Sequence, residues 1–540
     1  MKMKKINARE VFSDMNLQTE VCIMGAGVAG ITLASEFAKM GIRVVLLDAG
    51  GVEVDKRAQW DAKANSVSPN YPDPRMSRLR MLGGTSNHWS NNTSPLSSID
   101  FKKRDGLPNS GWPIKKEDLD PYYKLAAEYC GTGGDGYDLD YWMRNFNVSP
   151  TINSNSDSAL KLAIAKASVP PTKFFETQGQ YLEESLLVTL IHFAQVTDVD
   201  YSKLDKSISK VHFTTVSGGR HSVEADEFIM AFGGIENGRM LSHFNSKNNN
   251  ELGNQNDCVG RYFMDHPTLR AAQVFTPDED KFTMFSGVMD NDYKRFVLNF
   301  FELSESKIVE EKITNIRMPL QRATKQQLSD GISSFHLLKE RFSGGDVSGS
   351  FFNDVTNIVM DLDVVADTIS RKKFNKPLFD DVNEFSGFQV PLMMEQTAHR
   401  NNMISLSNKK DRFGIPMLNI NWQLHESDKN RLWRGLDIFA REMGAEGLGR
   451  VRVLKDRASR LFSDQLGFGH HHMGTTRMSN SPSDGVVNSE QLVFGTKNFS
   501  IAGSSVFPTG GHVPPTLTIV ATSIRLSKTI AKRLLRKNNG

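Results

Sequence analysis

The sequence is poor in the features that mark disulfide-rich, metal-binding and membrane-spanning proteins. Its 540 residues include only three cysteines, Cys22, Cys130 and Cys258, and none has the spacing of a zinc site or a redox pair. No stretch approaches the ~18 apolar residues that span a bilayer, and residues 1–18 lack the apolar segment of a signal peptide. We therefore expect a cytoplasmic protein with no metal site and no membrane insertion.

The chain also lacks a strong charge of either sign. Its 65 lysines and arginines nearly balance 62 aspartates and glutamates, so the net charge is +3. This balance gives no electrostatic reason to expect a nucleic-acid partner. Because 540 residues exceed the size of one ordinary core, we expect a soluble protein of two domains.

What the sequence does contain, near its N-terminus, is a glycine-rich turn between two patterned segments. Residues 20–24 predict a buried strand, and residues 31–40 predict a helix with one apolar side. Gly25 permits the tight turn, Gly27 lets the backbone approach a pyrophosphate, and Gly30 allows close packing of strand and helix. The phosphates would then lie at the helix N-terminus.

An acidic residue follows at the distance typical of a ribose contact. The apolar run 44–47 predicts a second strand and ends at Asp48, 18 residues after Gly30. A carboxylate about 20 residues beyond the third glycine is placed to accept the ribose hydroxyls. These features together indicate a dinucleotide site rather than a structural turn, but they do not separate FAD from NAD.

Further motifs occur in one order along most of the chain. They are Leu82-Gly83-Gly84-Thr85-Ser86-Asn87-His88-Trp89, Ser110-Gly111-Trp112-Pro113, Ala231-Phe232-Gly233-Gly234, Asp265-His266-Pro267, His471-His472-Met473-Gly474-Thr475, Gly485-Val486-Val487 and the stretch 504–509. This set resembles the glucose-methanol-choline (GMC) oxidoreductases, and its flavin loop is similar to that of pyranose oxidases. The resemblance is weakest between residues 280 and 385.

The resemblance implies an α/β fold of two domains with FAD as the cofactor. It assigns residues 1–125, 187–276 and 455–540 to a doubly wound, Rossmann-like FAD-binding domain. Residues 126–186 and 277–454 would form an α+β substrate-binding domain with an antiparallel sheet. Independently, the apolar pattern of residues 517–535 predicts a closing helix, and the Gly, Asn and Ser content of residues 137–155 and 343–354 predicts loops, which we interpret as lids.

The same resemblance extends the set of expected FAD contacts. Beyond the first glycine turn and Asp48 they are Gly83, Gly84, Thr85, His88, Ser90, Asn91, Val196, Gly233, Gly503, Ser504 and Thr516. Ser90 and Asn91 are expected near the N5 edge of the flavin. His88 occupies a position similar to the histidine that is joined covalently to FAD in pyranose oxidases. The sequence is compatible with a covalent bond between His88 and FAD and with a non-covalent contact, and we favour the contact.

A candidate base lies among three consecutive histidines, residues 470–472. Oxidation of an alcohol needs a base for the hydroxyl proton, and histidine suits that task because its ordinary pKa is about 6.5. In the family pattern His-x-x-Gly-Thr the base precedes the threonine by four residues, so Thr475 selects His471. In an extended segment His470 and His472 point away from His471, so we expect no metal site built from all three.

The second catalytic residue of the family is missing at its usual position. An asparagine or histidine there normally holds the substrate oxygen, but this chain has Pro514, which offers no side-chain donor. His512 is our candidate replacement, and a purely structural role for His512 is the alternative. We interpret the Asp265-His266 pair as a structural turn.

Three functions are compatible with these residues. We favour an FAD-dependent enzyme that oxidises an alcohol (a sugar, glycoside or other secondary alcohol) to a carbonyl and passes electrons to oxygen or to a quinone or cytochrome. Pro514 supports an alternative, a flavoprotein of the same fold with non-standard chemistry: a lyase, or a pathway-specific oxidase of a biosynthetic intermediate. The cofactor motifs and His471 argue against a non-enzymatic flavin-binding scaffold.

Overall fold

The N-terminal glycine turn belongs to a mostly parallel sheet. This computed structural model describes residues 3–11, 13–148, 151–152, 158–343, 350–379 and 381–538. The strand order of the sheet is β1-β6-β3-β2-β9-β8-β7, and β20 also pairs with β9. Its strands are β1 (Lys4–Asn7), β2 (Asn16–Met24), β3 (Val44–Leu47), β6 (Val188–His192), β7 (Gln195–Ser202), β8 (Ser207–Thr214), β9 (His221–Met230) and β20 (Phe499–Ile501). Only the β9-β8-β7 edge is antiparallel.

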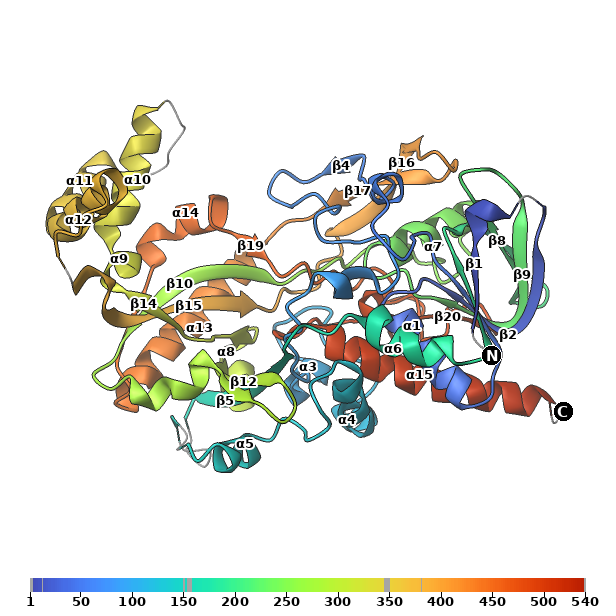
Figure 1. Cartoon of the computed structure of the whole chain (residues 1–540), viewed down its shortest axis with the longest axis horizontal. Helices are drawn as coiled ribbons and strands as arrows, with labels where there is room; N and C mark the ends of the chain where they lie inside the picture. The colour runs from blue at the N-terminus through green and yellow to red at the C-terminus, as the bar shows by residue number, and fades with distance from the viewer. Residues whose placement is uncertain are drawn as a thin grey trace.

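The strands of this sheet are apolar because helices cover them. Every residue of β3 and the last four of β2 are buried, as expected for parallel strands between helical layers. Helix α1 (Val28–Lys39) packs on β2 and β3, and α6 (Phe174–Glu183) packs on α1. Further helices of this half are α4 (Asp120–Tyr129), α7 (Glu236–Lys247) and α15 (Thr516–Asn538). The closing helix α15 packs against α1 and α4, so the two ends of the chain lie together (Figure 1).

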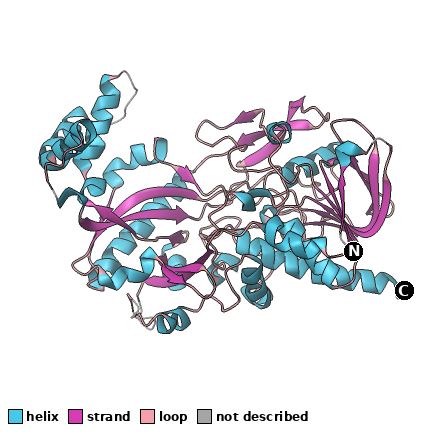
Figure 2. Ribbon diagram, in the orientation of Figure 1, coloured by secondary structure: helices cyan, strands magenta, loops and turns pink. Residues whose placement is uncertain are grey.

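A second, six-stranded sheet forms the other half of the molecule (Figure 2). It contains β10 (Pro267–Phe275), β13 (Ile316–Arg317), β14 (Gln321–Thr324), β15 (Phe385–Met394), β18 (Arg450–Val453) and β19 (Gly467–Phe468), all antiparallel. Two three-stranded sheets flank it: β5 (Leu160–Ser168), β11 (Val288–Asp290) and β12 (Arg295–Leu303), and β4 (Ser66–Val67), β16 (Met403–Lys410) and β17 (Pro416–Asn421). Helix α13 (Glu426–Ala445) packs beside β18.

The predicted segment boundaries need one correction. Residues 267–275, assigned above to the FAD-binding segments, form β10 in the middle of the six-stranded sheet, because their backbone pairs with β15 and β18. The rest of the proposed division stays a prediction.

Two stretches predicted as loops are partly helical. Residues 137–155 contain α5 (Leu139–Asn145), and residues 343–354 contain the first turn of α11 (Phe351–Met360). Residues 149–150, 153–157 and 344–349 lie outside the described part, so the interpretation of these stretches as lids is not tested there. Helices α9 (Lys325–Leu328), α10 (Asp330–Phe342), α11 and α12 (Leu362–Phe374) project from the far end of the six-stranded sheet (Figure 1).

The other short helices are α2 (Lys56–Trp60), α3 (Ser98–Phe101), α8 (Glu305–Glu311) and α14 (Ala458–Ser463). Across the described residues, we find no helix with the length and apolar character required to cross a bilayer.

Candidate active site

A cavity of about 760 Å³ is lined by segments of both large sheets. The glycine turn after β2 forms part of its wall, together with residues from the stretches 76–92, 231–236, 468–472 and 503–519. Thr268, Arg317, Pro391 and Met393 come from the six-stranded sheet. Segments far apart in the sequence therefore meet around one space.

The three glycines after β2 make the turn possible for different reasons. Gly25 has a φ of +112°, and a Cβ there would lie 2.5 Å from the Ala231 oxygen. A Cβ on Gly30 would lie 1.8 Å from the Gly25 oxygen, which is how α1 packs so closely on the turn. Gly27 lines the cavity, and no atom lies within 4 Å of the point where its Cβ would be. A side chain there would take up space that a pyrophosphate can use.

Asp48 is held by the backbone at the end of β3. Its Oδ2 accepts a hydrogen bond from the Ala26 N–H at 2.7 Å, and its Oδ1 accepts one from the Gly50 N–H at 2.7 Å. Burial raises the pKa of Asp48, while these two N–H groups and Arg80 act in the opposite direction. The carboxylate lines the cavity in a fixed orientation, as a ribose contact requires.

The flavin loop predicted at residues 82–91 borders the cavity, but not with every expected residue. Gly84, Thr85, His88 and Ser90 line it, whereas Gly83 supports the loop from behind with a φ of +87°.

Asn91, an expected FAD contact, does not line the cavity. Asn91 has a φ of +54° and is fully buried, and its Nδ2 donates to the Cys130 oxygen at 2.9 Å and to Ser168 Oγ. This left-handed residue leaves Asn92 on the cavity wall in its place.

The remaining predicted contacts all reach the cavity. They are Val196, Gly233, Gly503, Ser504 and Thr516. Ser504 Oγ also donates to the backbone oxygen of His472 at 2.6 Å, which ties the C-terminal glycine turn to the histidine segment. The structure thus brings the two ends of the chain to one site.

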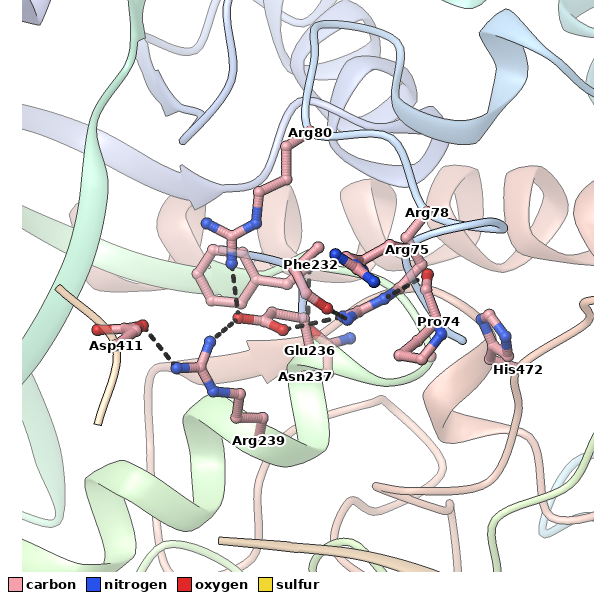
Figure 3. A network of polar contacts seen from close by, with 12 residues as sticks. Pro74, Arg75, Arg78, Arg80, Phe232, Glu236, Asn237, Arg239, Asp411 and His472 are labelled. Atoms are coloured by element: carbon pink, nitrogen blue, oxygen red, sulfur yellow. Dashed lines mark hydrogen bonds and ion pairs between the residues drawn. The ribbon is translucent and has the colours of Figure 1, made fainter. Parts of the chain in front are cut away.

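Two arginines that were not predicted from the sequence lie beside the same cavity and belong to a network of ion pairs (Figure 3). Arg78 and Arg80 line the cavity and both pair with Glu236, at 3.0 and 3.1 Å. Burial alone would raise the pKa of Glu236, but Arg239, Arg80 and Arg78 outweigh it and lower that pKa to about 2. Since Asp411 also pairs with Arg239, three guanidiniums and two carboxylates form one network beside the cavity. Guanidiniums are suited to hydrogen-bond the oxygens of a diphosphate.

His471 lies on the cavity wall and is held by two residues of the Asp265-His266 turn. Its backbone N–H donates to Asp265 Oδ1 at 2.7 Å, and its Nδ1 lies 2.8 Å from Nδ1 of His266. On the other side of the His266 ring, Nε2 lies 2.9 Å from the backbone oxygen of Gly511. The turn interpreted above as structural therefore contacts the candidate base directly.

These contacts fix which nitrogen of each ring carries its proton. A carbonyl oxygen only accepts, so Nε2 of His266 is the donor toward Gly511. Burial lowers the pKa of His266 to about 4, so its ring is neutral and its Nδ1 is an acceptor. His471 must then donate from Nδ1. Burial also lowers the pKa of His471 well below 6.5, which leaves its Nε2 as an unprotonated base.

The outer two histidines do not join His471 in a common cluster. His470 adopts a φ of +57°, and Nε2 of His472 lies 3.4 Å from Ser77 Oγ. Among the described residues, His470, His472 and Asp265 do place donor atoms within 4.8 Å of one another. The Asp265 carboxylate, however, already accepts hydrogen bonds from the Tyr71 hydroxyl and from two backbone N–H groups. The expectation of no metal site stays a prediction.

Pro514 lines the cavity, and His512 does not. His512 is fully buried behind the wall, where its Nε2 pairs with Glu302 Oε2 at 2.8 Å. Although burial opposes protonation, Glu302 together with nearby Asp100 and Glu395 raises the pKa of His512. The structure does not bring His512 into contact with the cavity, because its imidazole is turned toward strand β12.

The residues present fit an FAD molecule. A glycine with open space at its Cβ position, a fixed carboxylate at the end of β3 and two arginines together match a nucleotide with its pyrophosphate. Three further residues on or behind the wall, His266, Arg317 and Asn92, were not predicted. His266 belongs to the motif interpreted above as a structural turn, and Arg317 and Asn92 gave no local signal of a site.

Comparison with known proteins identifies the class. Residues 398–523 match the family profile described as GMC oxidoreductase. The chain is 23% identical to 2-methyl-1,2-propanediol dehydrogenase of Mycolicibacterium austroafricanum over 96% of both chains. It is 21% identical to 6'''-hydroxyparomomycin C oxidase of Streptomyces lividus, over 95% of this chain and 92% of that one. These matches support a member of the GMC oxidoreductase family.

Solved structures share the fold. Formate oxidase matches with a TM-score of 0.56 and 15% identity, over 96% of this chain and 99% of its own. Pyridoxine 4-oxidase from Mesorbium loti matches with a TM-score of 0.55 and 13% identity, over 95% and 99%. The predicted family, the Rossmann-like α/β fold with a substrate domain, the FAD-dependent oxidoreductase class and FAD as the cofactor are confirmed.

Proposed function

We propose that this enzyme oxidises an alcohol to a carbonyl compound, with His471 as the base that removes the hydroxyl proton. The observation that carries the proposal is the chain of hydrogen bonds from the Gly511 oxygen through His266 to His471. It leaves one unprotonated imidazole nitrogen, Nε2 of His471, for the proton of a substrate. FAD, when bound, supplies the acceptor of the hydride from the carbinol carbon.

The surroundings of His471 suit a proton that arrives and leaves. Its low pKa keeps the ring neutral before the reaction. Once Nε2 accepts a proton, the ring is a cation, and Nδ1 of His266 is already placed to accept its hydrogen bond. A hydrogen bond from a charged donor is stronger than the neutral one that it replaces. His266 therefore positions the base and stabilises the product of proton transfer.

The relatives support an alcohol group on a polyol or sugar as the substrate. Their names include a propanediol dehydrogenase, a fructose dehydrogenase and oxidases of hydroxyparomomycin and paromamine. Because this set mixes dehydrogenases and oxidases, the electron acceptor is either oxygen or a quinone or cytochrome.

Pro514 favours a second candidate function. It lines the cavity without a donor, and His512 is committed to Glu302, so neither supplies the usual second contact to the substrate oxygen. A flavoprotein of this kind with non-standard chemistry, a lyase or a pathway-specific oxidase, would bind FAD but would not be reduced by ordinary alcohols.

An anaerobic absorbance experiment separates the two candidates. The purified enzyme is mixed with polyols, sugars, glycosides and secondary alcohols while the flavin band near ~450 nm is followed. Alcohol oxidation predicts bleaching by at least one of them in the wild type. In His471→Ala we expect retained FAD and a reduction rate lower by about 10²–10⁴-fold. A flavin that dithionite reduces but no alcohol bleaches would support the second candidate, and full-rate bleaching of His471→Ala would remove His471 from the mechanism.

A further inference from the structure

The cavity wall carries a buried cation that has no carboxylate partner in the described part of the chain. Arg317, at the end of β13, is 5% exposed and lines the same cavity as His471. Burial lowers its pKa to about 10, and no acidic neighbour among the described residues offsets that effect. The side chain is still protonated at neutral pH, so a full positive charge faces the cavity.

Of the other four buried arginines among the described residues, all except Arg477 have the carboxylate partner that Arg317 lacks. Arg104 pairs with Glu395, Arg239 with Glu236 and Asp411, and Arg295 with Asp135 and Asp290. Removing a charge from water is costly, and a buried charge is normally compensated by a partner of opposite sign. The chain provides such a partner for each of those three arginines.

The guanidinium of Arg317 is held so that part of it stays available. Its Nη2 donates to Asn92 Oδ1 at 2.9 Å, and its plane lies over the Phe300 ring, with 4.5 Å from Cζ to the ring centroid. Its Nη1 makes no hydrogen bond to the described residues, whereas its Nε is enclosed by protein and unpaired. A guanidinium fixed in this way has little freedom to lose on binding, and its N–H groups match the oxygens of a carboxylate or phosphate.

We propose that Arg317 binds an anionic group of the substrate, so that the enzyme oxidises an alcohol that carries a carboxylate or a phosphate. This inference rests on the proposed alcohol oxidation and names its substrate class. Arg317 is near enough to His471 that its charge contributes to the low pKa of that base. The anionic group and the reacting hydroxyl therefore lie close together in the substrate, as in a hydroxy acid or a sugar phosphate.

The first test measures binding and does not depend on turnover. Acetate and inorganic phosphate are titrated separately into the FAD-loaded enzyme, and binding is followed by calorimetry and by the flavin spectrum. We expect Arg317→Gln to weaken binding of the preferred anion by at least about 10-fold, since hydrogen bonds to charged groups are among the strong ones. Arg322→Gln, the same change at an exposed arginine on β14 outside the cavity, serves as the matched control. Equal binding by Arg317→Gln and wild type overturns the proposal.

The second test compares matched alcohols under anaerobic conditions. A hydroxy acid is paired with its amide, and a sugar phosphate with its free sugar, and flavin reduction is measured for each. We expect the wild type to prefer the anionic member, and Arg317→Gln to lower that preference by about 100-fold. Arg317→Lys keeps the charge but not the planar fork, so it restores part of the preference. The pair with the larger preference shows whether the anion is a carboxylate or a phosphate.

The outcomes separate this inference from the function on which it rests. If neutral and anionic alcohols bleach the wild-type flavin equally, the role of Arg317 is refuted and alcohol oxidation stands. If no alcohol bleaches it, alcohol oxidation fails, and the anion titration still reports on Arg317. If Arg317→Gln loses its FAD while Arg322→Gln retains it, Arg317 holds the cofactor and the inference is overturned.

Discussion

Replacing His266 tests the arrangement of the base most directly. His266→Leu keeps much of the side-chain volume but removes the acceptor at 2.8 Å from Nδ1 of His471. The His471 ring then loses the bond that selects its tautomer and the bond that stabilises its protonated form. His266 does not line the cavity, so FAD should stay bound.

The size of the effect follows from the bond that is lost. A hydrogen bond from a charged donor contributes about 1.5–3 kcal/mol, which corresponds to a fall of roughly 10–150-fold in the rate of flavin reduction. His266→Asn is the informative companion, because its Oδ1 can replace Nδ1 as the acceptor, and part of the rate should return. Stopped-flow reduction at saturating alcohol isolates this step.

Buried His243 provides the control. Its Nε2 lies 3.1 Å from a backbone oxygen, as in His266, but it is outside the active-site cavity, so His243→Leu should affect stability without slowing reduction. A His266→Leu enzyme that keeps its FAD and is reduced at the wild-type rate would refute the tautomer argument.

Two further predictions concern His471 and His88. His471 acts as a base only while its ring is neutral, and burial lowers its pKa well below 6.5. The rate of flavin reduction should therefore stay constant as the pH falls from 8 through 6.5 and decline only in more acidic solution. A pH profile with a midpoint near 7 would contradict this expectation. His88 lines the cavity. Since we favour a non-covalent contact there, acid denaturation of the wild type should release free FAD. Flavin that stays with the precipitated wild-type protein, but is released from denatured His88→Ala, would establish the covalent bond.

Local sequence patterns predicted the cofactor end of the site well. A strand, a glycine turn and Asp48 are contiguous enough for their geometry to follow from spacing, and the structure places Gly27 and Asp48 on the cavity wall. Asn91 is buried away from the cavity while Asn92 lines it, and its left-handed backbone is a feature that periodicity does not reveal.

The substrate end could not be predicted in this way. Arg317 reaches the cavity from a two-residue strand in the region where no family motif is visible, and it lacks a carboxylate partner among the described residues. His266 was visible as part of a motif, but its contact with His471 joins residues 205 positions apart. His512 shows the converse, since closeness in sequence to Pro514 did not bring it to the cavity.

The pairing of β20 with β9 has a consequence for how the protein is made. Strand β20 begins at residue 499, and α15, which packs on α1, follows it in the sequence. The nucleotide-binding sheet is therefore incomplete until nearly the whole chain has been synthesised. Contacts of such long range are slow to form because loop closure must precede them. The emerging chain therefore exposes the parts of this sheet and of α1 that β20 and α15 cover last, and exposed apolar surface of this kind is prone to aggregation.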